Sequence, residues 1–179
     1  MSEVQKSGII RRAVASDLEA VNRLLEQVLQ VHHSGRPDLF QASGKKYSDA
    51  ELTAIFEDDS RPVFVYEKGG AESSDGQCQE SGKPCVCGEV LGYVFCCISE
   101  ASGAQLKPVK SMYIDDLCVD SDARGRHIGK ALFEHARKFA VSEGCHNITL
   151  HVWECNPSAR AFYDSLGLVP QYTSLEMVL

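Results

Sequence analysis

Apolar positions recur along the chain at two different periods, and these periods predict an order of strands and helices. Apolar runs and strict alternation predict strands at residues 9–14, 62–66, 89–98, 112–119, 148–152 and 172–179. Apolar spacings of three and four residues predict helices at residues 16–35, 48–56, 130–141 and 156–167. The predicted order is therefore one strand, two helices, three strands, a helix, a strand, a helix and a last strand.

Residues that cap helices support the predicted starts. Ser16 with Glu19, and Ser48 with Glu51, have the Ser-x-x-Glu spacing of a capping box, which satisfies backbone N–H groups at a helix N-terminus. Asn156 stands directly before a proline, a pair that is typical of a cap and first helical residue. Three of the four helices therefore have a chemically explained beginning.

This element order predicts an α/β (α+β) fold with a mixed central sheet of about six to seven strands flanked by about four helices. No repeat or linker divides the chain, so we expect a single domain over residues 1–179 with its core at about 8–179. Residues 69–88 are rich in Gly, Ser, Glu and Gln and predict a flexible hairpin insertion. This insertion carries Cys78, Cys85 and Cys87, whose spacing matches no zinc pattern, so no metal is expected.

Composition and charge narrow the function classes. The formal net charge of −7 argues against a nucleic-acid partner, which would require a basic face. No apolar stretch is long enough to span a membrane, and the first residues lack the apolar centre of a secretory signal, so a cytoplasmic protein is expected. Several of the eight cysteines lie inside apolar runs and are predicted to be reduced core residues.

A basic, glycine-bearing loop at residues 120–130 separates the predicted strand 112–119 from the helix that follows. Backbone N–H groups at a helix N-terminus have no helical acceptor, and the helix dipole favours negative charge there. The loop therefore predicts a site for an anion, and a phosphate-bearing ligand is the natural candidate.

Two motifs together resemble one known family. The segment Arg-Gly-Arg-His-Ile-Gly at residues 124–129 is similar to the acyl-CoA pyrophosphate loop of the GNAT superfamily of N-acetyltransferases, whose pattern is Arg or Gln, two residues, Gly, one residue, then Gly or Ala. Residues 156–168 resemble the second signature of the same superfamily. The resemblance covers nearly the whole chain and implies a GNAT fold, acetyl-CoA as co-substrate and, as for many members, a possible homodimer.

The resemblance also implies which residues hold the cofactor. In the superfamily, the strand that precedes the loop separates from its neighbour, which assigns the backbone of Leu117 and Val119 to the pantetheine arm. The residues implied around the pyrophosphate are Arg124, Gly125, Arg126, His127, Ile128, Gly129 and Lys130. Asn156 either touches the cofactor arm or simply caps its helix. His127 replaces the first Gly of the pattern, and we expect it to present its N–H if its φ is negative.

Amide formation needs an acid, a base and an oxyanion donor. The resemblance implies Tyr163 as the acid that protonates the CoA thiolate, whereas the alternative is an aromatic side chain packed in the core. Asp115 is the first candidate base and Asp116 the second. Strand alternation predicts that these two carboxylates point to opposite faces, and either of them could instead pair with a cation or bind the substrate ammonium.

Three functions remain open from the sequence. The first is an N-acetyltransferase that moves an acetyl group directly to a primary amine of a small molecule or a protein, which the presence of Tyr163 and both acids favours. The second is a non-catalytic acyl-CoA-binding or sensing module with the same fold. The third is a metal- or redox-responsive protein that uses the Cys-bearing insertion. The resemblance implies that the acceptor is chosen by the first two helices and their link, which contains His32 and His33, although these two residues are more simply a solvated helix end. His151 and Trp153 could line a pocket, or Trp153 could instead be core or sheet cover, and the sequence does not name the amine.

Overall fold

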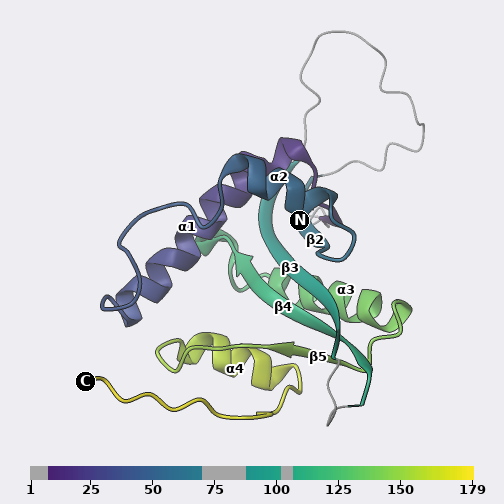
Figure 1. Ribbon diagram of the computed structural model, residues 1–179. Helices are drawn as coiled ribbons and strands as arrows, with labels where there is room; N and C mark the ends of the chain where they lie inside the picture. Colours follow the sequence, from purple (N-terminus) through teal and green to yellow (C-terminus); the bar gives the residue numbers. More distant parts are fainter. Residues whose placement is uncertain (1–7, 70–87, 102–106) are drawn as a thin grey trace, which may run out of the picture.

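A five-stranded mixed sheet forms the centre of the protein (Figure 1). The computed structural model describes residues 8–69, 88–101 and 107–179, and all that follows concerns these residues. The strands lie in chain order and are β1 (Ile9–Arg12), β2 (Val63–Lys68), β3 (Glu89–Ala101), β4 (Val109–Val119) and β5 (Asn147–Leu150). The first four pair in antiparallel fashion, and β5 is parallel to β4.

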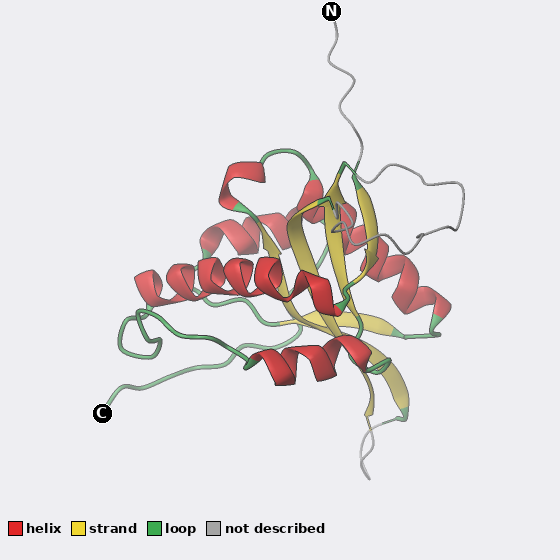
Figure 2. Ribbon diagram, turned by 90° about the horizontal axis from the view of Figure 1, so that it is seen from above, coloured by secondary structure: helices red, strands yellow, loops and turns green. Residues whose placement is uncertain are grey.

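Helices cover both faces of this sheet, as Figures 1 and 2 show from two directions. They are α1 (Leu18–Gly35), α2 (Asp49–Glu57), α3 (Ile128–Ser142) and α4 (Pro157–Ser165). The first two pack on one face, and α3 and α4 pack on the other. Because β4 and β5 are parallel, the chain needs a crossover between them, and α3 supplies it.

The sheet separates two hydrophobic cores, and strand alternation assigns residues to each. On β2, Val63 and Val65 point into the core beneath α1 and α2, whereas Phe64 points into the core beneath α3. Fully buried Leu24 of α1 and Leu132 of α3 are the corresponding helix residues. The predicted α/β fold class with helices on a mixed sheet is thus confirmed, with five strands among the described residues instead of six to seven.

The predicted last strand at residues 172–179 is wrong. This segment is irregular, and its apolar side chains, including Leu175 and Met177, are exposed. Alternation favours a strand only where a neighbouring strand offers its backbone, and β5 already ends at Leu150. The tail is held instead by side chains, since Glu176 forms an ion pair of 2.8 Å with Arg36 at the end of α1.

The two predicted capping boxes have different outcomes. The box at Ser48 is confirmed, because its hydroxyl accepts the N–H of Glu51 at 3.2 Å and the Glu51 carboxylate accepts the N–H of Ser48 at 2.8 Å. The box at Ser16 is wrong, because a short 3₁₀ turn precedes α1. There the buried carboxylate of Asp17 accepts the N–H of Val14 and the guanidinium of Arg11, contacts that an exposed Ser cannot match.

The predicted insertion at residues 69–88, with Cys78, Cys85 and Cys87, lies outside the described residues except for its two ends. The five described cysteines are all free thiols. Cys96 and Cys118 lie in the core as predicted, whereas Cys97, Cys145 and Cys155 are only partly buried. Within the described ranges there is no group of three potential metal ligands. None of the helices that the structure describes is long and apolar enough to cross a membrane.

Candidate active site

A β-bulge in β4 determines where the two candidate bases point. In the pairing with β3, Phe95 lies opposite Asp116 and the next residue, Cys96, lies opposite Ile114, so Asp115 is an extra residue without a partner. A bulge of this kind shifts the alternation by one residue. A face of the sheet that receives the odd-numbered side chains of β4 before the bulge therefore receives the even-numbered side chains after it.

Both carboxylates consequently face the side of the sheet that α1 and α2 cover. Before the bulge, Ile114 is buried in the core beneath α3, so Asp115 points to the other face. After the bulge, Cys118 is buried in the core beneath α1, and Asp116, two residues earlier, shares its face. The prediction that alternation would send the two acids to opposite faces is therefore wrong, because alternation alone does not count the extra residue.

The ammonium group of Lys46 bridges this acid pair. Its Nζ lies 2.9 Å from Oδ2 of Asp115 and 3.6 Å from Oδ2 of Asp116. The hydroxyl of Tyr47 donates a second hydrogen bond to Asp115 at 3.2 Å. The Asp115 side chain is 36% exposed and that of Asp116 only 11%, so solvent reaches one carboxylate far better than the other.

Burial gives Asp116 a perturbed acidity. Desolvation disfavours its charged form and raises the pKa of Asp116 to about 6, although the positive charge of Lys46 acts in the opposite direction. A carboxyl group with this pKa is ionised at neutral pH and still basic enough to take a proton from a substrate. Of the two candidates, Asp116 therefore has the chemistry of a base, whereas Asp115 is placed to hold a cation.

The C-terminal half of β4 presents a free backbone edge. Pairing with β5 runs from Ser111 opposite Asn147 to Ile114 opposite Leu150 and then stops. Beyond that point no described strand pairs with residues 115–119 on this side. Leu117 and Val119, which the family resemblance assigns to the pantetheine arm, lie on this edge, and the Val119 carbonyl accepts a hydrogen bond from the Arg124 side chain at 3.3 Å. An open edge of this kind can accept an extended ligand.

Helix α1 anchors the basic loop that follows β4. Arg23 forms an ion pair with the buried carboxylate of Asp120, which also accepts the N–H of Asp122 at 3.0 Å. The side chain of Gln27 accepts the N–H of Ser121 at 3.0 Å. Sequence reasoning missed this anchor, although an acid that ends a strand and precedes Ser-Asp is a recognisable turn signal.

His127 adopts a left-handed backbone conformation at the start of α3. Its φ is 62° and its ψ 13°, and it is the one non-glycine residue with positive φ in the described part of the chain. The condition set for His127 to present its N–H, a negative φ, is therefore not met. The backbone at His127 has the left-handed conformation that a Gly adopts readily, and in this conformation a His side chain has a steric cost.

The N-terminus of α3 differs from those of α2 and α4 in having no side-chain cap. Ser48 and Asn156 cap the other two helices, whereas the side chain of His127 makes no cap hydrogen bond. The first N–H groups of α3, from Ile128, Gly129 and Lys130, have no intrahelical acceptor. Arg124 and Arg126 flank them on an exposed loop, so the structure offers an anion both N–H groups and positive charge.

Substitutions at His127 separate backbone conformation from side-chain chemistry. We expect His127→Val to lower the free energy of unfolding by about 1 to 2 kcal/mol, because a β-branched residue tolerates positive φ poorly. We expect His127→Gly to change it by less than about 1 kcal/mol, because relief of strain and loss of chain stiffness oppose each other. Urea denaturation of the two variants checks this, and equal stability of Val and Gly would contradict the left-handed geometry.

The two glycines of this loop have different tasks. Gly125 has a φ of 77° and open space around it, so its backbone conformation is what requires glycine. Gly129 lies against α4, and a Cβ atom added there would come within 3.3 Å of the Phe162 ring. Gly129 therefore allows α3 and α4 to pack closely, in addition to presenting its N–H.

Helix α4 places Tyr163 beside the cleft. Its ring packs against Phe162 and Phe133 at centroid distances of 5.0 and 6.5 Å. Burial, and after it the negative charge of Asp116, raise the pKa of Tyr163, so its hydroxyl stays protonated at neutral pH and can donate. Asn156 caps this helix, since its Oδ1 accepts the N–H of Ala159 at 3.1 Å, which is the second of the two roles considered for it.

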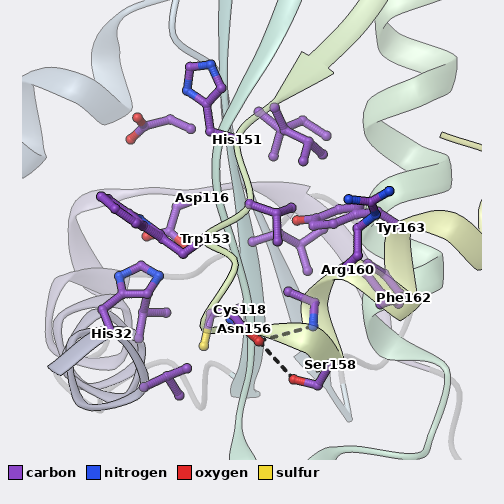
Figure 3. A pocket seen from close by; sticks show the side chains of 18 of the residues that line it. His32, Asp116, Cys118, His151, Trp153, Asn156, Ser158, Arg160, Phe162 and Tyr163 are labelled. Carbon is purple, nitrogen blue, oxygen red and sulfur yellow. Dashed lines mark hydrogen bonds between the residues drawn. The ribbon is translucent and has the colours of Figure 1, made fainter. Parts of the chain in front are cut away.

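A broad cleft brings these groups together. It is lined by α1, the loop after it, β4, β5, the start of α3 and α4, and Figure 3 shows Asp116, Cys118, Asn156 and Tyr163 around it with His32, His151 and Trp153. Burial raises the pKa of the Cys118 thiol to about 12, and its Sγ lies 3.6 Å from the Leu24 carbonyl. This thiol is therefore no nucleophile at neutral pH.

Aromatic and histidine side chains form the wall opposite α4. The ring of Phe40 lies between His32 at 4.9 Å and Trp153 at 5.2 Å. His151 lies 3.1 Å from the Tyr113 hydroxyl and also contacts the hydroxyl of Tyr172. His33 lies 2.8 Å from the Phe40 carbonyl and so holds the loop that follows α1.

Sequence reasoning singled out the four residues that bound or support this wall from α1 and from the chain after β5, namely His32, His33, His151 and Trp153. It missed Lys46, Tyr47 and Tyr113. The first two lie on a loop with no periodic pattern, so nothing local indicated that they would reach β4. Tyr113 belongs to a predicted strand, but its face depends on the bulge.

Comparison with known families identifies the fold. The family model described as the acetyltransferase (GNAT) family matches residues 26–168, most of the chain. The chain belongs to the acetyltransferase (GNAT) family. This confirms the resemblance carried by residues 124–129 and 156–168, and it relates the protein to enzymes of acyl transfer.

Curated relatives in the family are distant. An uncharacterized N-acetyltransferase from Methanocaldococcus jannaschii is 33% identical over 90 residues, which are 50% of this chain and 36% of the relative. A probable glucosamine 6-phosphate N-acetyltransferase from Oryza sativa is 33% identical over 57 residues, which are 32% of each protein. The matches to these relatives thus span only about a third of their length.

Solved structures resemble the whole chain. A mutant of the BH1408 protein from Bacillus halodurans has a TM-score of 0.81 and 28% identity, with 96% of this chain and 99% of that chain covered. An aminoglycoside acetyltransferase from an uncultured soil metagenomic sample, in complex with trehalose, has a TM-score of 0.66 and 17% identity, with 99% of both chains covered. The second likeness shows the shared GNAT fold alone.

Proposed function

We propose that this GNAT protein is an acetyl-CoA-dependent N-acetyltransferase that moves an acetyl group directly to a primary amine of a small molecule or a protein. The observation that carries the proposal is the bulge in β4, which gathers Asp115 and Asp116 around an ammonium group. Tyr163, protonated and within the electrostatic reach of Asp116, lies beside the same cleft. A candidate base and a candidate acid beside one cleft support the proposal, since amide formation requires both.

The residues present fit acetyl-CoA. The uncapped start of α3, with Arg124, Arg126 and Lys130, suits the pyrophosphate, and the free backbone edge of β4 suits the pantetheine arm. When bound, acetyl-CoA supplies the thioester whose carbonyl carbon the amine attacks. The side-chain amide oxygen of Asn156 already caps α4. We therefore assign Asn156 primarily to the fold, and contact with the cofactor arm is its secondary role.

The chain's own residues divide the proton transfers. Asp115 holds the incoming ammonium, and Asp116, with its pKa raised to about 6, takes a proton from it. Tyr163 gives its proton to the departing thiolate. Because the burial of Cys118 raises the pKa of its thiol to about 12, the transfer needs no covalent intermediate on this residue.

A panel of acceptors tests the proposal. The protein is incubated with acetyl-CoA and, in turn, polyamines, aminoglycosides, amino acids and lysine-bearing peptides, and the release of free CoA thiol is followed. We expect release that depends on both protein and amine. Tight binding of acetyl-CoA with no release for any amine would overturn the proposal and favour the acyl-CoA-binding module instead.

A further inference from the structure

Lys46 occupies the place where the proposed reaction needs an amine. Its ammonium group lies 2.9 Å from the carboxylate that would hold a substrate and 3.6 Å from the carboxylate that would deprotonate it. The Lys46 side chain is about half-buried at 42% exposure, and its Nζ lies 5.3 Å from the centre of the Tyr47 ring, within cation–π range. In chemical terms, Lys46 is a primary alkylammonium bound at the acid pair.

The loop that carries Lys46 is tied to the rest of the molecule on both sides. Towards α1, the side chain of Gln30 donates to the Ala42 carbonyl at 2.6 Å. Towards the sheet, the ring of Tyr47 stacks on Phe95 at 6.2 Å, and its hydroxyl reaches Asp115. Lys46 is thus brought to the acids by an anchored loop and by a neighbouring side chain.

The adjacent Lys45 provides an internal comparison. Its Nζ lies 2.8 Å from Oδ1 of Asp49 in the first turn of α2, and both side chains are well exposed. Asp49 also accepts a hydrogen bond from Asn22 of α1. Two consecutive lysines on one loop therefore have different surroundings, and only the second meets the two acids on β4.

We infer that Lys46 is a self-acetylation site of this protein, an inference that rests on the proposed function. Asp116 and solvent accept a proton from the Lys46 ammonium, and the free amine attacks the carbonyl carbon of acetyl-CoA. A C–N bond forms and the C–S bond breaks, the thiolate takes a proton from Tyr163, and the second proton that leaves the nitrogen restores the Tyr163 hydroxyl. The products are Nε-acetyl-Lys46, CoA with a free thiol and one proton released to the solvent.

The local charges agree with this chemistry. Burial alone would lower the pKa of Lys46, but the carboxylates of Asp116 and Asp115 more than offset it and raise this pKa. Lys46 is therefore charged at neutral pH and needs a base, which Asp116 provides in direct contact. Acetylation removes that charge, after which the acid pair has no lysine ammonium to bind.

The test uses the whole chain described above with isotope-labelled acetyl-CoA and no added amine. Peptide mass spectrometry follows the label at Lys46 and Lys45 over time, and free-amine acetylation is measured in parallel. Because a positioned amine reacts faster than an exposed one, we expect labelling at Lys46 at least about tenfold faster than at Lys45. The rate per molecule is expected to be independent of protein concentration, as for transfer within one chain.

Variants make the outcomes distinct. Lys45→Arg should keep the label at Lys46, whereas Lys46→Arg should lose it without a gain at Lys45. Asp116→Asn should slow it strongly. Equal labelling of both lysines, or a rate that rises with protein concentration, would overturn the inference. Transfer to free amines without label at Lys46 would overturn it and leave the proposed function intact, whereas transfer to neither would count against both.

Discussion

Replacing Tyr163 with Phe is expected to reduce turnover by about a hundredfold or more and to leave the affinity for CoA nearly unchanged, since a general acid contributes roughly 10² to 10⁴ in rate. The ring packs against Phe133 and Phe162, and Phe keeps those contacts. Only the hydroxyl is lost, which burial and the charge of Asp116 keep protonated. Steady-state thiol release gives the turnover, and calorimetry with CoA gives the affinity.

Tyr66→Phe is the matched control for this substitution. Tyr66 lies on β2, and its hydroxyl accepts the N–H of Gly8 at 3.1 Å, away from the cleft. Removing that hydroxyl should leave turnover at the level of the unmodified protein. Full turnover in Tyr163→Phe would remove Tyr163 from the acid role and assign it to core packing.

Replacing Asp116 with Asn is expected to lower kcat/KM by about a hundredfold or more and to change its pH dependence. The base form of Asp116 is the ionised one, and its pKa is raised to about 6, so kcat/KM should rise with pH through about 6. Asn cannot titrate, so this rise should disappear in the variant. A pH profile measured with one fixed amine checks both effects.

Three neighbouring groups influence the titration of Asp116 that this measurement follows. Lys46 faces it from the loop before α2, Tyr93 from β3 and Asp115 from its own strand, and all three affect the pKa of Asp116. Asp115→Asn is the matched control, because it removes a neighbouring charge and keeps the titrating group. A profile that still rises through about pH 6 in Asp116→Asn would assign that titration to another residue.

The same titration predicts a dependence of stability on pH. Burial raises the pKa of Asp116 above its value in the unfolded chain, so between about pH 4 and 6 the folded state holds the proton more tightly. Its contribution to the free energy of unfolding is therefore largest below that range and is lost as the pH rises through about 6. Asp116→Asn should flatten this slope in urea denaturation at several pH values.

Much of the fold could be predicted because its signals are local. Apolar periodicity located the four helices and five of the strands, and Ser48 and Asn156 marked two helix starts correctly. The proposed cofactor loop also rests on a contiguous pattern, residues 124–129. Signals of this kind depend only on residues that are neighbours in the sequence, so the sequence alone contains them.

The remaining features depend on contacts between distant segments. The bulge at Asp115 arises from the register of β4 against β3, for which no residue in either strand gives a marker. Lys46 reaches the acids across 69 positions of sequence. The tail after Gly167 has the alternation of a strand, but a strand forms only where a partner lies beside it. The left-handed conformation of His127 could not be predicted from its residue type, because non-glycine residues favour a negative φ.

The bulge has a consequence for any change in the length of β4. Deleting Asp115 would restore uninterrupted pairing with β3, but every side chain on one side of the deletion would then exchange faces. Either Met112 and Ile114 would leave the core beneath α3, or Cys118 would leave the core beneath α1. One extra residue therefore keeps both halves of the strand in phase with their own core, and a shift of one position here rearranges the interior on both sides of the sheet.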